Sequence, residues 1–189
     1  MNADLLVYQA KAFYNAYIAL DQLSRDDSDT LLLLFAPLVV NGTFSVELAL
    51  KAILAKNQIE YGKEHNLLIL FQMLPKSFQQ ELWAYLIEKA PEYAGSEKGL
   101  DELILLSNAF VDWRYAFEGK PVPAIESRFL AAFANAAVHT MFSYYNADLL
   151  PATKTESNNE IEQRFHENRE KCKEINLKMI QKKTKEHQL

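Results

Sequence analysis

A long and almost wholly apolar stretch between residues 30 and 58 constrains the fold of this 189-residue chain more than any other feature. At 100° per residue, its apolar positions cover most of the circumference of a helix. A helix of this kind has to be covered by neighbouring elements on most of its sides. We therefore predict a central helix that ends near Gln58. Its start is either Thr30 or Pro37, because proline fits the first turn of a helix and kinks a longer one.

The remainder of the chain is rich in helix-forming residues and contains only five glycines. Apolar residues recur at steps of three and four before Arg25, and the acidic run from Arg25 to Asp29 is expected to form a loop. Further helices are predicted over residues 67–74, 77–88, 103–117 and 124–146, with a turn over 91–99. The predicted fold class is all-α, an up-down helical bundle with short extra helices.

The C-terminal part differs in composition from the body. We predict a helical bundle over residues 1–150, a polar hinge over 151–159 and a charged C-terminal helix over 160–189. A narrow apolar face of that helix would be too small to bury alone in water, so it is expected to pack on its own core or on a second subunit. The residues of this face are Ile161, Phe165, Cys172, Ile175 and Met179.

Charge, cysteine and hydropathy exclude several functions. Residues 152–189 carry nine Lys/Arg and seven Asp/Glu, so residues 1–151 have a net charge of −7. An acidic body argues against duplex DNA binding, which needs clustered cations. The single cysteine, Cys172, forms no internal disulfide, and this favours a cytoplasmic protein. The longest apolar run, Leu31 to Val40, is about half of the ~20 residues that span a bilayer, so no membrane segment is predicted.

One acid and one base interrupt the apolar central stretch. Glu47 and Lys51 lie four residues apart, which places the carboxylate and the ammonium on neighbouring turns of one helix face. Burying such a pair costs desolvation energy that the attraction only partly offsets, so the pair is better evidence for a site than for stability. The structural alternative is that Lys51 extends towards solvent while Glu47 bonds a neighbouring helix.

A polar cluster that contains His65 and Asn66 follows the central helix. The two residues are expected to cap the next helix, and the alternative for His65 is an exposed imidazole that acts as acid or base or contacts a nucleotide. His139 is expected to be a hydrogen-bonded core residue. No second His lies three or four residues from either one, and no Gly-rich phosphate loop occurs. We predict no metal and no cofactor.

Arg114 and Glu118 border an apolar stripe on the helix predicted over 103–117. The planar fork of an arginine suits phosphate or carboxylate recognition, and an ion pair with another helix, for example with Glu47, fits the position equally well. The catalytic residues are unknown, with His65 and Arg114 as candidates. The candidate ligand-binding residues are Glu47, Lys51, His65, Asn66, Arg114 and Glu118.

Three elements in order resemble the HEPN domains of prokaryotes, whose name abbreviates higher eukaryotes and prokaryotes nucleotide-binding. They are Phe-Ser-Val-Glu-Leu-Ala-Leu-Lys-Ala at 44–52, His-Asn-Leu at 65–67 and Trp-Arg-Tyr-Ala-Phe-Glu at 113–118. The resemblance covers about residues 4–146 and implies a HEPN-like bundle and a homodimer. Many active HEPN domains are metal-independent ribonucleases in which a His follows an Arg after four to six residues. The window after Arg114 holds Gly-Lys-Pro instead, so this pair is not carried over.

Three functions fit these observations. We favour a non-catalytic HEPN-like module that binds a nucleotide, RNA or a nucleotidyltransferase or antitoxin partner. The alternative is a divergent metal-independent ribonuclease of a toxin or defence system, with His65 as general acid or base and Arg114 or Lys51 stabilising the phosphorane charge. The second alternative is a structural protein that only oligomerises.

Overall fold

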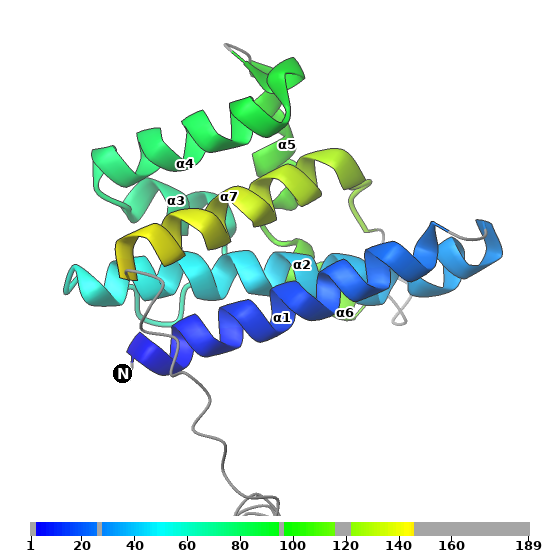
Figure 1. Ribbon diagram of the computed structural model, residues 1–189, viewed down its shortest axis with the longest axis horizontal. Coiled ribbons are helices and arrows are strands. Elements are labelled where there is room, and N and C mark those ends of the chain that lie inside the picture. Colours follow the sequence, from blue (N-terminus) through cyan, green and yellow to red (C-terminus); the bar gives the residue numbers. More distant parts are fainter. Residues whose placement is uncertain (1–2, 26–27, 95–96, 116–121, 146–189) are drawn as a thin grey trace, which may run out of the picture. The chain divides into compact units, whose positions relative to one another are not determined.

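The computed structural model describes residues 3–25, 28–94, 97–115 and 122–145, without the side chains of 28–32. These residues form helices and no strand, which confirms the all-α prediction (Figure 1). The predicted hinge, the C-terminal helix and Glu118 lie outside the described residues. The helices are α1 (Ala3–Ser24), α2 (Ser28–Lys56), α3 (Leu67–Met73), α4 (Lys76–Lys89), the 3-10 helix η1 (Pro91–Tyr93), α5 (Glu97–Leu106), α6 (Ala109–Arg114) and α7 (Ser127–Tyr145).

α2 is the central helix of the bundle. It packs against α1, α3, α6 and α7, and the side chains of Val46, Leu50 and Ile53 are completely buried. Pro37 lies inside α2, so the helix is the longer of the two predicted alternatives. It begins at Ser28, within the segment that was expected to be a loop. An internal proline donates no backbone hydrogen bond.

The composition of α2 follows from this central position. Among the described residues, one segment, Leu33–Lys56, is long and apolar enough to cross a membrane, and more than half of it is buried inside the protein. α1, α6 and α7 supply the apolar surroundings that such a helix requires. The hydropathy of this segment is therefore accounted for by the core of the bundle.

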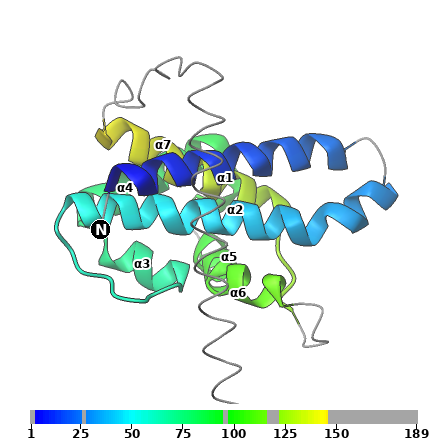
Figure 2. The same cartoon turned by 90° about the horizontal axis from the view of Figure 1, so that it is seen from below.

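α1 and α7 approach α2 closely (Figures 1 and 2). The approach is possible because residue 42 of α2 is a glycine. A Cβ atom at Gly42 would lie 3.0 Å from Cδ2 of Tyr17 in α1 and 3.2 Å from Cδ1 of Leu130 in α7. On its other side α7 packs against α4, and the rings of Phe129 and Phe133 stack in the core with centroids 5.6 Å apart.

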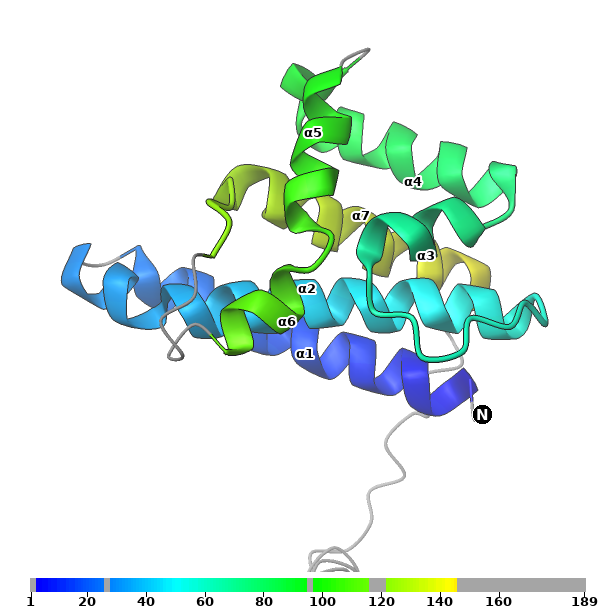
Figure 3. The same ribbon diagram turned by 180° about the vertical axis from the view of Figure 1, so that it is seen from behind.

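The single helix predicted over 103–117 is wrong, since two helices, α5 and α6, cover this region (Figure 3). The break falls at Ser107 and Asn108, which are weak helix formers. The Ser107 hydroxyl donates to the Leu103 carbonyl at 2.9 Å, and the Ser107 carbonyl accepts the N–H of Leu67 at 2.9 Å. The N–H of Leu67, at the start of α3, thus takes the place of the N–H that a continuing helix would have offered to the Ser107 carbonyl. α5 also begins at Glu97, inside the predicted turn.

Buried tyrosines predict that the bundle loses stability in alkali. Burial raises the pKa of Tyr145 to about 12, and its hydroxyl donates to the Ala52 carbonyl at 2.8 Å. Burial also raises the pKa of Tyr17 and Tyr93 well above the usual value for tyrosine. Where an unfolded tyrosine ionises at about pH 10 and the folded one stays protonated, raising the pH favours the unfolded state.

We therefore expect the melting temperature to fall as the pH rises from about 10 towards 12. Thermal melts followed by circular dichroism between about pH 8 and 12 measure this effect. Tyr145→Phe, which removes one of the ionising groups, should reduce the fall, whereas Tyr8→Phe at an exposed position should leave it unchanged. A melting temperature that is constant across this range would contradict the prediction.

Candidate functional site

α2 carries Glu47 and Lys51 into the interior of the protein. The Glu47 side chain is 1% exposed and that of Lys51 is 9% exposed. Lys51 Nζ donates to Glu47 Oε1 at 2.7 Å. The two residues therefore form a buried pair, one turn apart on the same helix, as their spacing indicated.

His65 joins this pair from the loop between α2 and α3. Its Nδ1 lies 2.8 Å from Glu47 Oε1, the oxygen that also binds Lys51. Because a carboxylate oxygen accepts hydrogen bonds, Nδ1 is the donor in this contact and Nε2 is left for a second partner. The His65 side chain is 52% exposed. A buried carboxylate thus holds a half-exposed imidazole in one tautomer.

The second carboxylate oxygen of Glu47, Oε2, is buried and has no hydrogen-bond partner among the described residues. An unsatisfied buried polar atom costs about 1–3 kcal/mol, and more when it is charged. Tyr61 lies close to the pair, with Lys51 Nζ 5.4 Å from its ring centroid. Burial first, and then the charge of Glu47, raise the pKa of Tyr61. The buried carboxylate of Glu47 therefore binds Lys51 and His65 through one oxygen and leaves the other unsatisfied, at a cost to the fold.

The turn after α2 brings the chain back towards Glu47. Ile59 N–H donates to the Leu54 carbonyl at 3.0 Å, a bond typical of a helix that ends in a left-handed residue. That residue is Gln58, with φ of 59°, and Gly62 follows with φ of 55°. Two left-handed residues within five positions reverse the chain tightly, which places His65 beside the helix that it has just left.

Hydrogen bonds hold the loop immediately before α3. Glu64 Oε1 accepts the backbone N–H groups of His65 at 2.9 Å and of Asn66 at 2.7 Å. Asn66 Oδ1 accepts the N–H of Ile69 at 3.0 Å, which confirms Asn66 as the cap of α3. The capping role predicted for the His65 side chain is wrong, because its ring binds Glu47 instead. Asn66 Nδ2 also donates to Asn108 Oδ1 at 3.1 Å, so its amide serves the fold.

Arg114 lies outside this cluster. It is exposed near the end of α6, where its guanidinium lies over the rings of Phe110 and Tyr115 at 4.8 and 4.7 Å. Its Nη2 donates to the Tyr115 hydroxyl at 3.0 Å. The ion pair considered for Arg114 and Glu47 does not occur in the described part of the chain, because the two aromatic rings hold the guanidinium elsewhere. The structure therefore brings together Glu47, Lys51 and His65, uses Asn66 to cap α3, and leaves Arg114 apart.

His139 is not the core residue that was predicted. It is exposed on α7, and its ring stacks on that of Tyr85 in α4 with centroids 3.9 Å apart. Its buried neighbours, Val138 and Thr140, misled the prediction, because each step along a helix turns by 100°. Among the described residues, no group of three or more His, Cys, Asp or Glu is placed to hold a metal ion.

Sequence reasoning did not identify Tyr61 and Glu64 as part of this site. Tyr61 lies in a loop, where no periodicity marks it, and its place beside Lys51 depends on the turn after α2. Glu64 was recognisable, since an acid just before a helix start is a common acceptor for free backbone N–H groups. Its effect is to orient the residue next to it, His65.

The comparison with protein families identifies the domain that holds this cluster. Residues 35–121 match the family model of the HEPN domain. The matched range includes Glu47, Lys51, His65 and Arg114, whereas α1 and α7, which cover α2, lie outside it. No curated protein and no solved structure matches the chain. The match, together with the all-helical fold, shows that this chain carries a HEPN domain over residues 35–121.

Proposed function

We propose that this HEPN domain is a non-catalytic module that binds a nucleotide or RNA, with His65 in contact with a phosphate of the ligand. The observation that carries the proposal is the 2.8 Å contact between His65 Nδ1 and Glu47 Oε1. A protonated imidazole near neutral pH donates a charge-assisted hydrogen bond to a phosphate oxygen. Because Glu47 holds Nδ1, the ring would use Nε2 for that bond without losing its orientation.

The family resemblance adds partners to this proposal. A cytoplasmic homodimer, and a nucleotidyltransferase or antitoxin as a second protein, remain predictions from that resemblance. The association of the predicted helix over 160–189 also remains a prediction.

A ribonuclease is the second candidate, and the same contact favours it. A carboxylate that binds one nitrogen of a histidine fixes the tautomer of a general acid or base. RNA cleavage also needs a group that stabilises the charge of the phosphorane. Lys51 donates to Glu47 inside the protein, and Arg114 makes no contact with His65 among the described residues. Binding is therefore the better supported function.

His65→Ala tests the proposal. We expect the dissociation constant for a fluorescently labelled single-stranded oligoribonucleotide or a nucleotide to rise about tenfold or more, since a hydrogen bond between charged groups contributes about 1.5–3 kcal/mol. The melting temperature should change little, because the Lys51–Glu47 bond remains. His139→Ala is the matched control, an exposed histidine on α7. Fluorescence anisotropy measures the dissociation constants of the wild type and of both variants.

Two outcomes of this experiment contradict the binding module. Equal affinities of the wild type, His65→Ala and His139→Ala for both probes would remove His65 from the ligand site. Gel analysis of the same mixtures in the presence of a metal chelator tests whether the protein cleaves RNA. Metal-independent cleavage that is lost in His65→Ala and kept in His139→Ala would establish the ribonuclease instead.

A further inference from the structure

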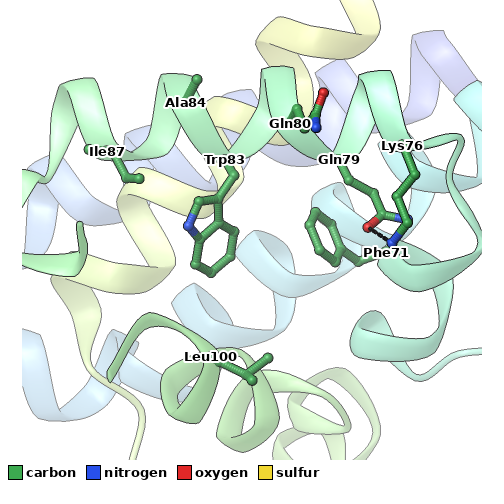
Figure 4. A pocket seen from close by; sticks show the side chains of 8 residues that line it. All are labelled: Phe71, Lys76, Gln79, Gln80, Trp83, Ala84, Ile87 and Leu100. Atoms are coloured by element: carbon green, nitrogen blue, oxygen red, sulfur yellow. Dashed lines mark hydrogen bonds between the residues drawn. The ribbon is translucent and has the colours of Figure 1, made fainter. Parts of the chain in front are cut away.

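α4 borders an open groove that shares no residue with the Glu47–His65 cluster (Figure 4). Its volume is about 620 Å³, within the range of roughly 300–1,000 Å³ that is usual for small-molecule sites. The α4 residues that line it recur at steps of three and four, so they form one face of that helix. They are Lys76, Gln79, Gln80, Trp83, Ala84 and Ile87, and Phe71 of α3 and Leu100 of α5 complete the lining.

The apolar walls of the groove are held in place. The Trp83 ring lies 5.9 Å from the Phe71 ring, between centroids, and Leu100 lies across from both on α5 (Figure 4). Trp83 lies against the backbone of α5 because residue 99 is a glycine. A Cβ at Gly99 would lie 2.9 Å from Cζ2 of Trp83. An apolar groove with positioned walls is therefore present before any ligand binds.

The shape and charge of the groove restrict what it can hold. Lys76 and Ile87 are eleven residue steps apart on α4, which corresponds to about 16 Å along the helix axis, so the groove is elongated. Lys76 lies at one end and is the single charged residue of the lining. Its Nζ donates to Gln79 Oε1 at 3.2 Å, and it forms no ion pair with a described carboxylate. An occupant should combine an extended apolar part with one negative charge.

We propose that the groove binds an unbranched aliphatic carboxylate, with the chain between Trp83 and Leu100 and the carboxylate at Lys76. Burial of the chain against aromatic and aliphatic walls supplies most of the binding free energy, at about 25 cal/mol per Å² of apolar surface. The ammonium of Lys76 supplies orientation by complementing the charge of the head group. The proposal is independent of the function of the Glu47–His65 cluster.

Titration with dodecanoate and with dodecan-1-ol tests this proposal, because the two probes share a tail and differ in charge. The chain contains two tryptophans, so a Trp113→Phe background leaves Trp83 as the only one. Both probes should change the emission of Trp83 in a saturable way at concentrations below micelle formation. Lys76→Gln should weaken the binding of dodecanoate about two- to fivefold, which is the effect of losing an exposed ion pair, and it should leave the binding of dodecan-1-ol unchanged.

A pair of leucine variants provides the control. Leu100→Gln should weaken both probes, whereas Leu33→Gln, at an 80% exposed position of α2, should weaken neither. The proposal is overturned if neither probe changes the emission of Trp83. It is also overturned if Lys76→Gln loses affinity for both probes equally, or if the two leucine variants change the affinities equally. Binding of a short amphipathic helical peptide in place of dodecanoate would also overturn it, in favour of a protein partner.

Discussion

Replacing Glu47 with leucine is expected to lower the free energy of unfolding by about 3–5 kcal/mol, because it leaves the buried ammonium of Lys51 without its partner. Lys51→Met should cost less, since His65 still donates to the remaining carboxylate. The double variant Glu47→Leu/Lys51→Met should return to within about 1–2 kcal/mol of the wild type, because an apolar pair of similar volume replaces both charges. Urea denaturation of the wild type, the two single variants and the double variant measures the four free energies of unfolding.

An exposed pair with the same spacing provides the control for this cycle. Asp21 and Arg25 are also four residues apart, but the arginine side chain is 74% exposed. Asp21→Ala should therefore cost less than about 1 kcal/mol. A loss for Glu47→Leu that is as small as that for Asp21→Ala would mean that the pair is not buried in solution. A stable double variant with weakened nucleotide binding would separate the role of Glu47 in the site from its role in the fold.

Leu50→Ala is the second substitution with a large expected effect. Leu50 is completely buried in the C-terminal half of α2, and truncation of a buried leucine costs about 2–5 kcal/mol through lost burial and the cavity that remains. Leu33→Ala is the control on the same helix, where the side chain is 80% exposed and the loss should be below about 1 kcal/mol. Similar losses for the two variants would show that α2 is not the central helix.

The positions of most helices could be predicted from the sequence because helix formation depends on local pattern. The recurrence of apolar residues at steps of three and four placed α3, α4 and α7 within a few residues of their observed limits, and it placed the end of α1 before Arg25. The break between α5 and α6 escaped this pattern, since the apolar stripe continues through it. Ser107 ends α5 because its carbonyl accepts a hydrogen bond from Leu67, forty positions earlier in the sequence, and no local pattern contains that bond.

The candidate site was predictable only in part, for the same reason. Glu47 and Lys51 are four residues apart on one helix, so their contact followed from helix geometry. His65 is 18 residues from Glu47, and the contact depends on the left-handed turn after α2. Arg114 was grouped with these residues by chemistry, but the rings of α6 hold its guanidinium away from them.

By itself, the sequence determined the all-helical class, the apolar central helix and the Glu47–Lys51 pair, because each of these depends on residues within a few helical turns. Only the tertiary structure decided that His65 meets Glu47, that His139 is exposed and that α4 and α5 border an open apolar groove. Each of these features depends on how distant helices pack. The packing depends on close approaches, such as those at Gly42 and Gly99, that no periodicity in the sequence reports.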